Sequence, residues 1–288
     1  MNPKKRKTAL KAPVLALLFL FLLFSEGTAR AAGNALALAA SRVLPSLLPF
    51  MVLSSLLLRL ERASGNRGGA RSALLLGVVC GVPIGATLLS DRTPEEKERF
   101  LPLASLISPS FCLSFLGGGY KNPLVGALIF LSSLLGAIAS HALLHCKKGN
   151  RPAQPGPEKS EPLSLPALLT SSVGSAVSSA GSVTVCIVFF SCLSAALSRL
   201  FDALAAPAWL PLLLTGLLEA SSGCGAALAL SSPLSTAISA FFIGFGGLSA
   251  AFQALSAAGG ARLFPYLFEK LLTALLTLAF WLFFSLIL

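Results

Sequence analysis

One carboxylate stands inside a long apolar stretch, and it is the first candidate for chemistry in this chain. Glu219 lies within the apolar run from Trp209 to Leu230. A charged side chain is costly at membrane depth, so a carboxylate in such a run is expected to have a function. It could accept hydrogen bonds from a ligand hydroxyl or amine, or carry a proton. Two other roles stay open: a place at the water-exposed tip of a hairpin, or holding the break of its own helix.

Four further polar side chains are candidates to bind a small ligand beside Glu219. Ser221 and Ser222 follow it directly in the chain, and Ser108 and Gln253 occur in other apolar runs. The alternative for the serines is a hydrogen bond to the backbone of their own helix. The sequence contains no Ser/His/Asp, Cys/His or paired-carboxylate arrangement and no phosphate-loop spacing. We therefore expect no enzyme, no catalytic residue and no cofactor.

The histidines and cysteines do not indicate a metal site or a disulfide framework. His141 and His145 have the i, i+4 spacing of a helix but no carboxylate near them in the sequence, so we expect the end of a membrane helix there and no metal. Most of the cysteines lie in apolar runs, where cysteine behaves as a small hydrophobic residue, and no C-x-x-C pair occurs among them. The six are Cys80, Cys112, Cys146, Cys186, Cys192 and Cys224.

The composition of this chain is that of a protein embedded in a lipid bilayer. Of the 288 residues, 55% are hydrophobic and 11% are charged, and the mean hydropathy is +0.82. A soluble domain carries about 25% charged residues, so a soluble enzyme, a disordered protein and a nucleic-acid-binding domain are excluded. The net charge of +11 comes from basic residues clustered in short loops, which follows the positive-inside rule of membrane proteins. We expect an all-α polytopic membrane protein.

The apolar runs divide the chain into four parts. Residues 1–33 combine a basic start with a short apolar run, which is typical of a retained membrane anchor and also of a cleaved signal peptide. Residues 34–146 and 163–288 hold the remaining runs. Residues 147–162 are basic and proline-rich, and they form the linker between the two halves.

Within these halves the expected spans have different characters. The part of the run before Pro45 can lie along the membrane interface, and the Ser- and Ala-rich run from Leu163 to Gly181 is expected to be interfacial or partly inserted. Leu101 to Gly119 is expected to be one span. Thr93, followed by Pro94, is expected to cap a short helix before it. In all we expect eight or nine membrane elements.

Proline and glycine interrupt the apolar runs. Gly81-Val82-Pro83-Ile84-Gly85 breaks the helical hydrogen-bond ladder, and such backbone is tolerated at membrane depth only when protein or a watered cavity surrounds it. This predicts two half-helices forming a re-entrant hairpin, with a second hairpin around Ser221 to Ala226. We expect the hairpins to meet near the bilayer midplane, with Glu219 and Gln253 at their junction. The residues assigned to chain breaks and close helix contacts are Gly81, Pro83, Gly85, Gly223, Gly225, Gly246 and Gly247.

A weak internal repeat relates the two halves at a distance of 140 residues. Arg59-Leu60 then falls on Arg199-Leu200, and Gly85-Ala86 on Gly225-Ala226. If the first hairpin re-enters from the cytoplasmic side, the N-terminus and 18 of the 22 basic residues lie inside. The halves then run in opposite directions, so we expect two inverted repeats, each with a broken-helix hairpin, which is the build of secondary transporters.

Three motifs resemble one membrane family. Gly81-Val82-Pro83-Ile84-Gly85-Ala86 is similar to the G-Y-P-x-G-A motif of sporulation integral-membrane proteins of the YlbJ type, which belong to the nucleoside-recognition (Gate) family. Leu218 to Cys224 resembles that family's L-E-x-T-N-G-C. Gly244 to Ser249 with Gln253 resembles its G-F-G-G-L-S-x-x-x-Q. The order of the motifs agrees over roughly residues 40 to 260.

The resemblance implies a membrane protein needed for spore formation, from a family that includes nucleoside carriers. Together with the basic-residue distribution and the inverted repeats, it leads us to expect a multi-pass protein of the cell membrane, with a cytoplasmic N-terminus, that moves a small polar, nucleoside-like solute by alternating access. The chain departs from the family at Val82, at Ser221-Ser222 and at Ala251, where the family has Tyr, Thr-Asn and His. These losses of polar or aromatic groups favour the alternative of a non-transporting protein required for assembly of the spore envelope. The expected partners are the bilayer and a small solute, with no nucleic acid; the oligomeric state stays open.

Overall fold

Helices make up every regular element in the part of the chain that the structure, a computed structural model, describes: residues 3–63, 70–90, 92–145, 164–207, 209–230, 232 and 234–286. The first half contains α1 (Pro3–Leu23), α2 (Ser25–Leu38), η1 (Ala39–Val43), α3 (Leu44–Ala63), α4 (Ala70–Cys80), α5 (Ile84–Thr87), α6 (Pro94–Ala104), α7 (Pro109–Phe111), η2 (Cys112–Gly117) and α8 (Pro123–His145). The second half contains α9 (Leu165–Ala203), α10 (Trp209–Leu218), α11 (Ala220–Leu228), α12 (Leu234–Phe245), α13 (Gly247–Ala258) and α14 (Leu263–Ser285).

Six helical segments in the described residues are long and apolar enough to cross a membrane, so the chain is a multi-pass membrane protein by length and composition. Two shorter apolar helices, Lys11–Leu23 and Trp209–Leu218, add to them. The six segments are Ser25–Leu57, Pro94–Gly117, Pro123–His145, Leu165–Ala203, Leu234–Ala258 and Leu263–Ser285.

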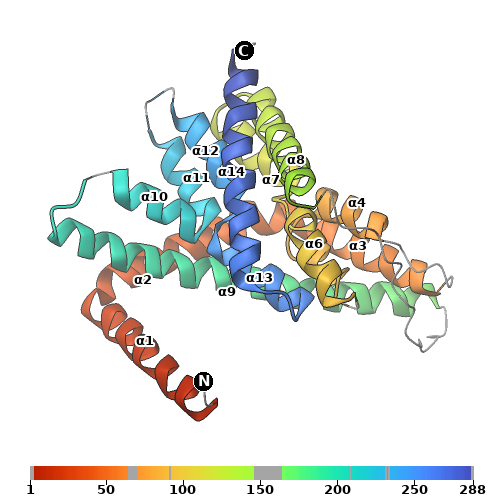
Figure 1. The fold of residues 1–288 in the computed structure, drawn as a ribbon, viewed down its shortest axis with the longest axis horizontal. Helices are drawn as coiled ribbons and strands as arrows, with labels where there is room; N and C mark the ends of the chain where they lie inside the picture. Colours follow the sequence, from red (N-terminus) through yellow and green to blue (C-terminus); the bar gives the residue numbers. More distant parts are fainter. Residues whose placement is uncertain are drawn as a thin grey trace.

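Two long helices of equal length pack antiparallel across the molecule. The first runs without interruption from Ser25 to Ala63 through α2, η1 and α3, and α9 also has 39 residues. The Cys192 thiol donates to the Thr28 carbonyl at 3.4 Å near one end, and Arg59 donates to Ser175 at 3.0 Å near the other. At 1.5 Å per residue each helix is about 58 Å long. A hydrocarbon core is about 30 Å thick, so this pair must lie at a steep tilt, and Figure 1 shows α9 crossing α14.

The continuity of these helices shows that two expected segments are not separate elements. The residues before Pro45 and residues 165–181 each continue directly into a longer helix. The wide π-helical turn η1 precedes Pro45 and opens the hydrogen-bond ladder where a proline ring would otherwise clash. In α9, a Cβ added at Gly174 or Gly181 would meet no atom within 4 Å, so neither glycine marks a break.

A second pair of equal helices, α8 and α14, also packs antiparallel. Each has 23 residues, and Leu263 follows Pro123 by 140 positions. Ser140 and Thr273 share a hydrogen bond of 2.7 Å between their hydroxyls. Near the middle, a Cβ on Gly136 would lie 2.8 Å from the Thr277 backbone nitrogen, so only glycine permits this approach.

Four interruptions break the remaining helices. They separate α4 from α5 at residues 81–83, α6 from α7 at 105–108, α10 from α11 at Glu219, and α12 from α13 at Gly246. The expected span from Leu101 to Gly119 largely coincides with the segment Pro94–Gly117, which is long and apolar enough to cross a membrane. It is broken at 105–108, because Pro109 cannot donate the backbone hydrogen bond that would continue α6. The expected cap at Thr93 is confirmed, since its side chain accepts from the Glu96 amide and Glu96 reciprocates in a capping box.

Candidate functional site: a cavity where four helix breaks meet

The four helix breaks border one cavity between the two long helices. It holds about 490 Å³ of space between atoms, counting its open mouth, so only a small molecule could occupy it. The breaks contribute Val82, Ile107 and Ser108, Glu219 and Ala220, and Gly246. The rest of the lining is Val43, Leu47, Phe111, Val183, Ile187, Ser221, Ser249, Ala250 and Gln253.

In the first half, the break after α4 pairs with the break after α6. The Val82 amide donates to the Leu106 carbonyl at 3.2 Å, so the two unwound segments satisfy part of each other's backbone. Gly81 has a φ of +72°. A Cβ there would lie 2.9 Å from both the Leu106 carbonyl oxygen and the Ser108 nitrogen. Glycine at position 81 is thus required by conformation and by space.

In the second half, the break after α10 packs on the break after α12 in the same manner. Gly247 has a φ of +81°, and a Cβ on it would lie 2.9 Å from the Ala220 nitrogen and 3.3 Å from the Leu218 carbonyl oxygen. Gly246 also has a positive φ, of +83°. The two glycines therefore let α13 start against the start of α11. The predicted chain breaks at Gly81 and at Gly246-Gly247 are confirmed.

Glu219 is buried and holds the start of α11. Its side chain is 4% exposed, and its two carboxylate oxygens accept hydrogen bonds from the amides of Ser221 at 3.0 Å and Ser222 at 2.5 Å. Among the roles considered from the sequence, capping the break of its own helix is therefore observed, and exposure at a hairpin tip is not. A carboxylate offers about four acceptor positions. Besides the two amides, the side chains of Ser221 and Ser222 also interact with this carboxylate, which lines the cavity.

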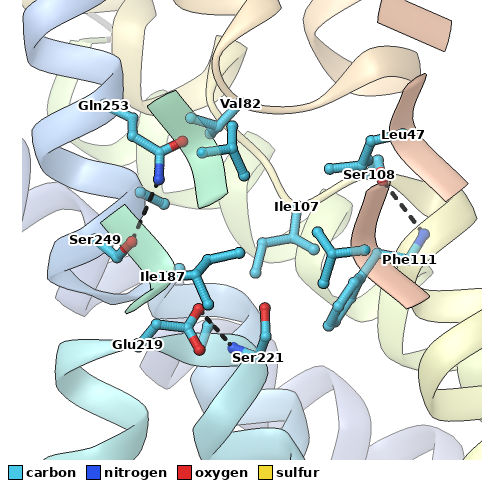
Figure 2. Close-up of a pocket in the computed structure, with 15 residues that line it drawn as sticks. Leu47, Val82, Ile107, Ser108, Phe111, Ile187, Glu219, Ser221, Ser249 and Gln253 are labelled. Carbon is cyan, nitrogen blue, oxygen red and sulfur yellow. Dashed lines mark hydrogen bonds between the residues drawn. The ribbon is translucent and has the colours of Figure 1, made fainter. Parts of the chain in front are cut away.

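Ser108, Ser221 and Gln253 line the same cavity as Glu219. The Ser108 hydroxyl caps α7 by accepting from the Phe111 amide at 3.3 Å, and the Gln253 amide nitrogen donates to the Ser249 hydroxyl at 3.3 Å. Figure 2 shows Glu219, Ser249 and Gln253 on one side of the cavity and Leu47, Ser108 and Phe111 on the other. Polar and apolar side chains therefore both line the site.

Ser222 and three of the assigned glycines lie away from the cavity. The Ser222 hydroxyl shares a hydrogen bond of 2.9 Å with Ser191 on α9. A Cβ on Gly85 would lie 2.7 Å from the Gly77 Cα, and one on Gly223 would lie 2.2 Å from the Gly216 Cα. At Gly225 the nearest atom would be 3.9 Å away. The expected close helix contact therefore involves Gly223 and not Gly225.

The sequence analysis missed a buried cation behind the cavity. Lys270 was counted among the basic residues of a cytoplasmic loop, but it lies within α14 and is 1% exposed. Its ammonium donates to the Ser105 carbonyl at 3.3 Å, at the break after α6, and lies 3.9 Å from where a Cβ of Gly246 would be. The sequence does contain a signal for this residue, because Lys270 directly precedes an apolar run. A charged side chain there is as costly at membrane depth as the carboxylate of Glu219.

Comparison with protein-family models, curated proteins and solved structures gives no match for this chain.

Proposed function

We propose that this protein carries a small polar solute across the membrane through the cavity where the four breaks meet, by alternating access. The observation that carries the proposal is the meeting of Val82, Ser108, Glu219 and Gly246 at one cavity. Unwound backbone is tolerated at membrane depth only where it is enclosed by protein or lines a watered cavity. Discontinuous helices that meet near the midplane form the binding sites of secondary transporters.

The proposed architecture is a pair of inverted repeats. The boundary predicted before residue 34 falls inside the continuous helix from Ser25 to Ala63, so the repeats are proposed as residues 25–146 and 163–288. Three features support it. The long helices and the pair α8 and α14 match in length, each equivalent pair packs antiparallel, and each half contains two breaks that contact each other. A pseudo-two-fold axis in the membrane plane would relate the two halves, so that their helices cross the membrane in opposite directions. On this arrangement α4–α5 and α10–α11 are re-entrant hairpins that enter from opposite faces.

The proposed solute is nucleoside-like, with a polar edge and a flat apolar body. Glu219 and the Gln253 amide would bind its donors and acceptors, and Ser221 and Ser108 would add hydroxyl contacts. Phe111, Leu47 and Ile187 would pack on its apolar face. The motif resemblance to the nucleoside-recognition family supports the same class of solute and a role in sporulation.

The proposed location is the cell membrane with the N-terminus in the cytoplasm. The distribution of basic residues supports this orientation, since it leaves few of them outside. Residues 147–162, which carry Lys147, Lys148 and Arg151, lie outside the described residues and would be a cytoplasmic linker.

Uptake into proteoliposomes tests the proposed function. The full chain is reconstituted and assayed against a panel of nucleosides and small polar metabolites, with ligand-dependent thermal stabilisation measured in parallel. We expect Glu219→Gln and Gln253→Leu to lose uptake and stabilisation for a compound that the unaltered chain carries. Ser172→Ala is the matched control, because its hydroxyl donates to the Leu168 carbonyl of its own helix and does not line the cavity, and it should retain both. No response to any compound would refute the proposal.

The second candidate is a non-transporting membrane protein needed to assemble the spore envelope. The observation that favours it is the engagement of both Glu219 oxygens by backbone amides, which makes a structural role sufficient for that residue. Under this alternative, a spore-forming host carrying Glu219→Gln would sporulate normally and no solute would be carried. Defective sporulation of Glu219→Gln with normal amounts of the protein in the membrane would argue against it.

A further inference from the structure

A second buried polar cluster lies where the end of α8 meets the first turns of α14. The His145 Nε2 is 2.9 Å from the Glu269 Oε2, and the His141 Nδ1 is 3.7 Å from the Glu269 Oε1. The three side chains are 17%, 13% and 4% exposed, in the order His141, His145, Glu269. No carboxylate lies near the histidines in the sequence, but Glu269 reaches them in the fold from a helix 124 residues farther along.

Hydrogen bonding within the described residues does not satisfy this cluster. The contact between His145 and Glu269 accounts for one atom of each, while the His141 Nδ1 and the Glu269 Oε1 are buried without a hydrogen-bond partner. An unsatisfied buried polar atom costs about 1–3 kcal/mol, and more when it is charged. A group that engages all three side chains at once would remove that cost.

We propose that His141, His145 and Glu269 bind a divalent transition-metal ion of the Zn²⁺ class, which ties α8 to α14. One ligand atom from each residue can be chosen so that all three lie within 4.8 Å of one another. In a tetrahedral site with bonds of roughly 2.0–2.1 Å, ligand atoms lie about 3.3 Å apart. Small side-chain rotations therefore suffice to close the site around an ion.

The donor set favours this class of ion over Mg²⁺ or Ca²⁺. Two imidazoles and one carboxylate suit Zn²⁺ and its neighbours in the first transition row, whereas Mg²⁺ and Ca²⁺ prefer oxygen ligands alone. Two histidines at i, i+4 on one helix face are a spacing that zinc sites use. Of the neighbouring groups, Phe100 stacks on His141 with ring centroids 5.5 Å apart, and the Lys270 ammonium donates to the Ser105 carbonyl.

The site binds an ion without the equipment for zinc hydrolysis. In the helical zinc-protease motif the residue after the first histidine is a glutamate that acts as general base, and here it is Ala142. The cluster residues do not line the cavity of the four breaks. The metal site is therefore independent of the proposed solute site, and it holds together the two equivalent helices α8 and α14.

Cobalt substitution tests the site directly. The full chain is purified without a polyhistidine tag, stripped with a chelator, and titrated with Co²⁺, which gives strong visible bands in a four-coordinate site. We expect bands that saturate at one equivalent, disappear when Zn²⁺ is added and do not change with Mg²⁺, together with a rise in Tm that saturates at the same ratio.

Variants distinguish this site from other metal-binding groups. Glu269→Gln and His145→Ala should lose the bands. His141→Ala should weaken them while keeping the contact between His145 and Glu269 that supports the fold. Glu26→Gln, which changes an exposed carboxylate outside both sites, is the control and should bind Co²⁺ as the unaltered chain does. Absence of bands in the unaltered chain, or unchanged bands in folded Glu269→Gln and His141→Ala, would overturn the proposal, and neither readout depends on transport.

Discussion

Two glycines on α11 provide a matched test of how the broken helices pack. Gly223 and Gly225 lie two positions apart in the same helix, and both have helical backbone conformations. A Cβ added at Gly223 would lie 2.2 Å from the Cα of Gly216 and 2.8 Å from its nitrogen, both backbone atoms that cannot rotate away. A Cβ at Gly225 would meet only the Phe115 ring, at 3.9 Å, which is an ordinary contact.

The two substitutions to alanine should change the free energy of unfolding in opposite directions. Replacing glycine by alanine inside a helix stabilises it by about 0.5–1 kcal/mol when there is space. Adding a methyl group to a filled contact costs about 1–3 kcal/mol. We therefore expect Gly225→Ala to raise the free energy of unfolding by up to about 1 kcal/mol. At Gly223 the clash with backbone outweighs that gain, so Gly223→Ala should lower it by about 1–2 kcal/mol.

Unfolding by SDS in mixed micelles measures both values. The chain has two tryptophans, Trp209 and Trp281, and the second is 2% exposed, so their fluorescence reports loss of packing. Gly223→Ala should unfold at a lower SDS fraction than the unaltered chain, and Gly225→Ala at an equal or higher one. If the two variants unfold together, α10 and α11 do not pack through Gly216 and Gly223.

Three further predictions concern single contacts and the topology. Thr93→Ala should destabilise the chain by about 1 kcal/mol in the same unfolding assay, because it removes the capping box with Glu96; Thr93→Ser should restore most of the loss. Tyr120→Phe should cost about 1 kcal/mol, because it leaves the buried Ser239 hydroxyl without its 2.8 Å partner, and an unchanged stability would contradict this. A cysteine placed at residue 155 of a cysteine-free chain should resist an impermeant thiol reagent in intact cells, and labelling from outside would refute the cytoplasmic linker.

The parts of the fold that could be predicted from sequence are those where a residue violates a local rule. Pro83 cannot donate the hydrogen bond that would continue a helix, and Gly81 and the pair Gly246-Gly247 disfavour one, so the breaks at these points were predictable. Glu219 was found because a carboxylate is costly in an apolar run. The break at 105–108 was missed because Pro109 marks it only at its far end, after four residues that a helix accepts.

The parts that could not be predicted depend on contacts between distant residues. Leu163 to Gly181 was separated from the helix that follows because serine and glycine weaken the apolar signal. In α9, however, several of these serine hydroxyls donate to backbone carbonyls of the same helix, as Ser172 does to Leu168, and so remove their polar cost. The His141 and Glu269 contact joins two helices from different halves, so no spacing in the sequence reveals it. The burial of Lys270 follows from the Ser105 carbonyl that the break in α6 leaves free.

The N-termini of α11 and α13 both lie at the cavity, and they create a difference in electrostatic potential across it. The N-terminus of a helix carries a partial positive charge of roughly half a unit. At α11 the Glu219 carboxylate offsets this charge, but α13 begins after Gly246, which has no side chain to do so, and the Lys270 ammonium lies close behind. The potential therefore rises from the Glu219 side of the cavity toward the Gly246 side. If the cavity binds a solute as proposed, a dipolar solute would be favoured in one orientation, with its electron-rich end toward Gly246 and its donors toward Glu219.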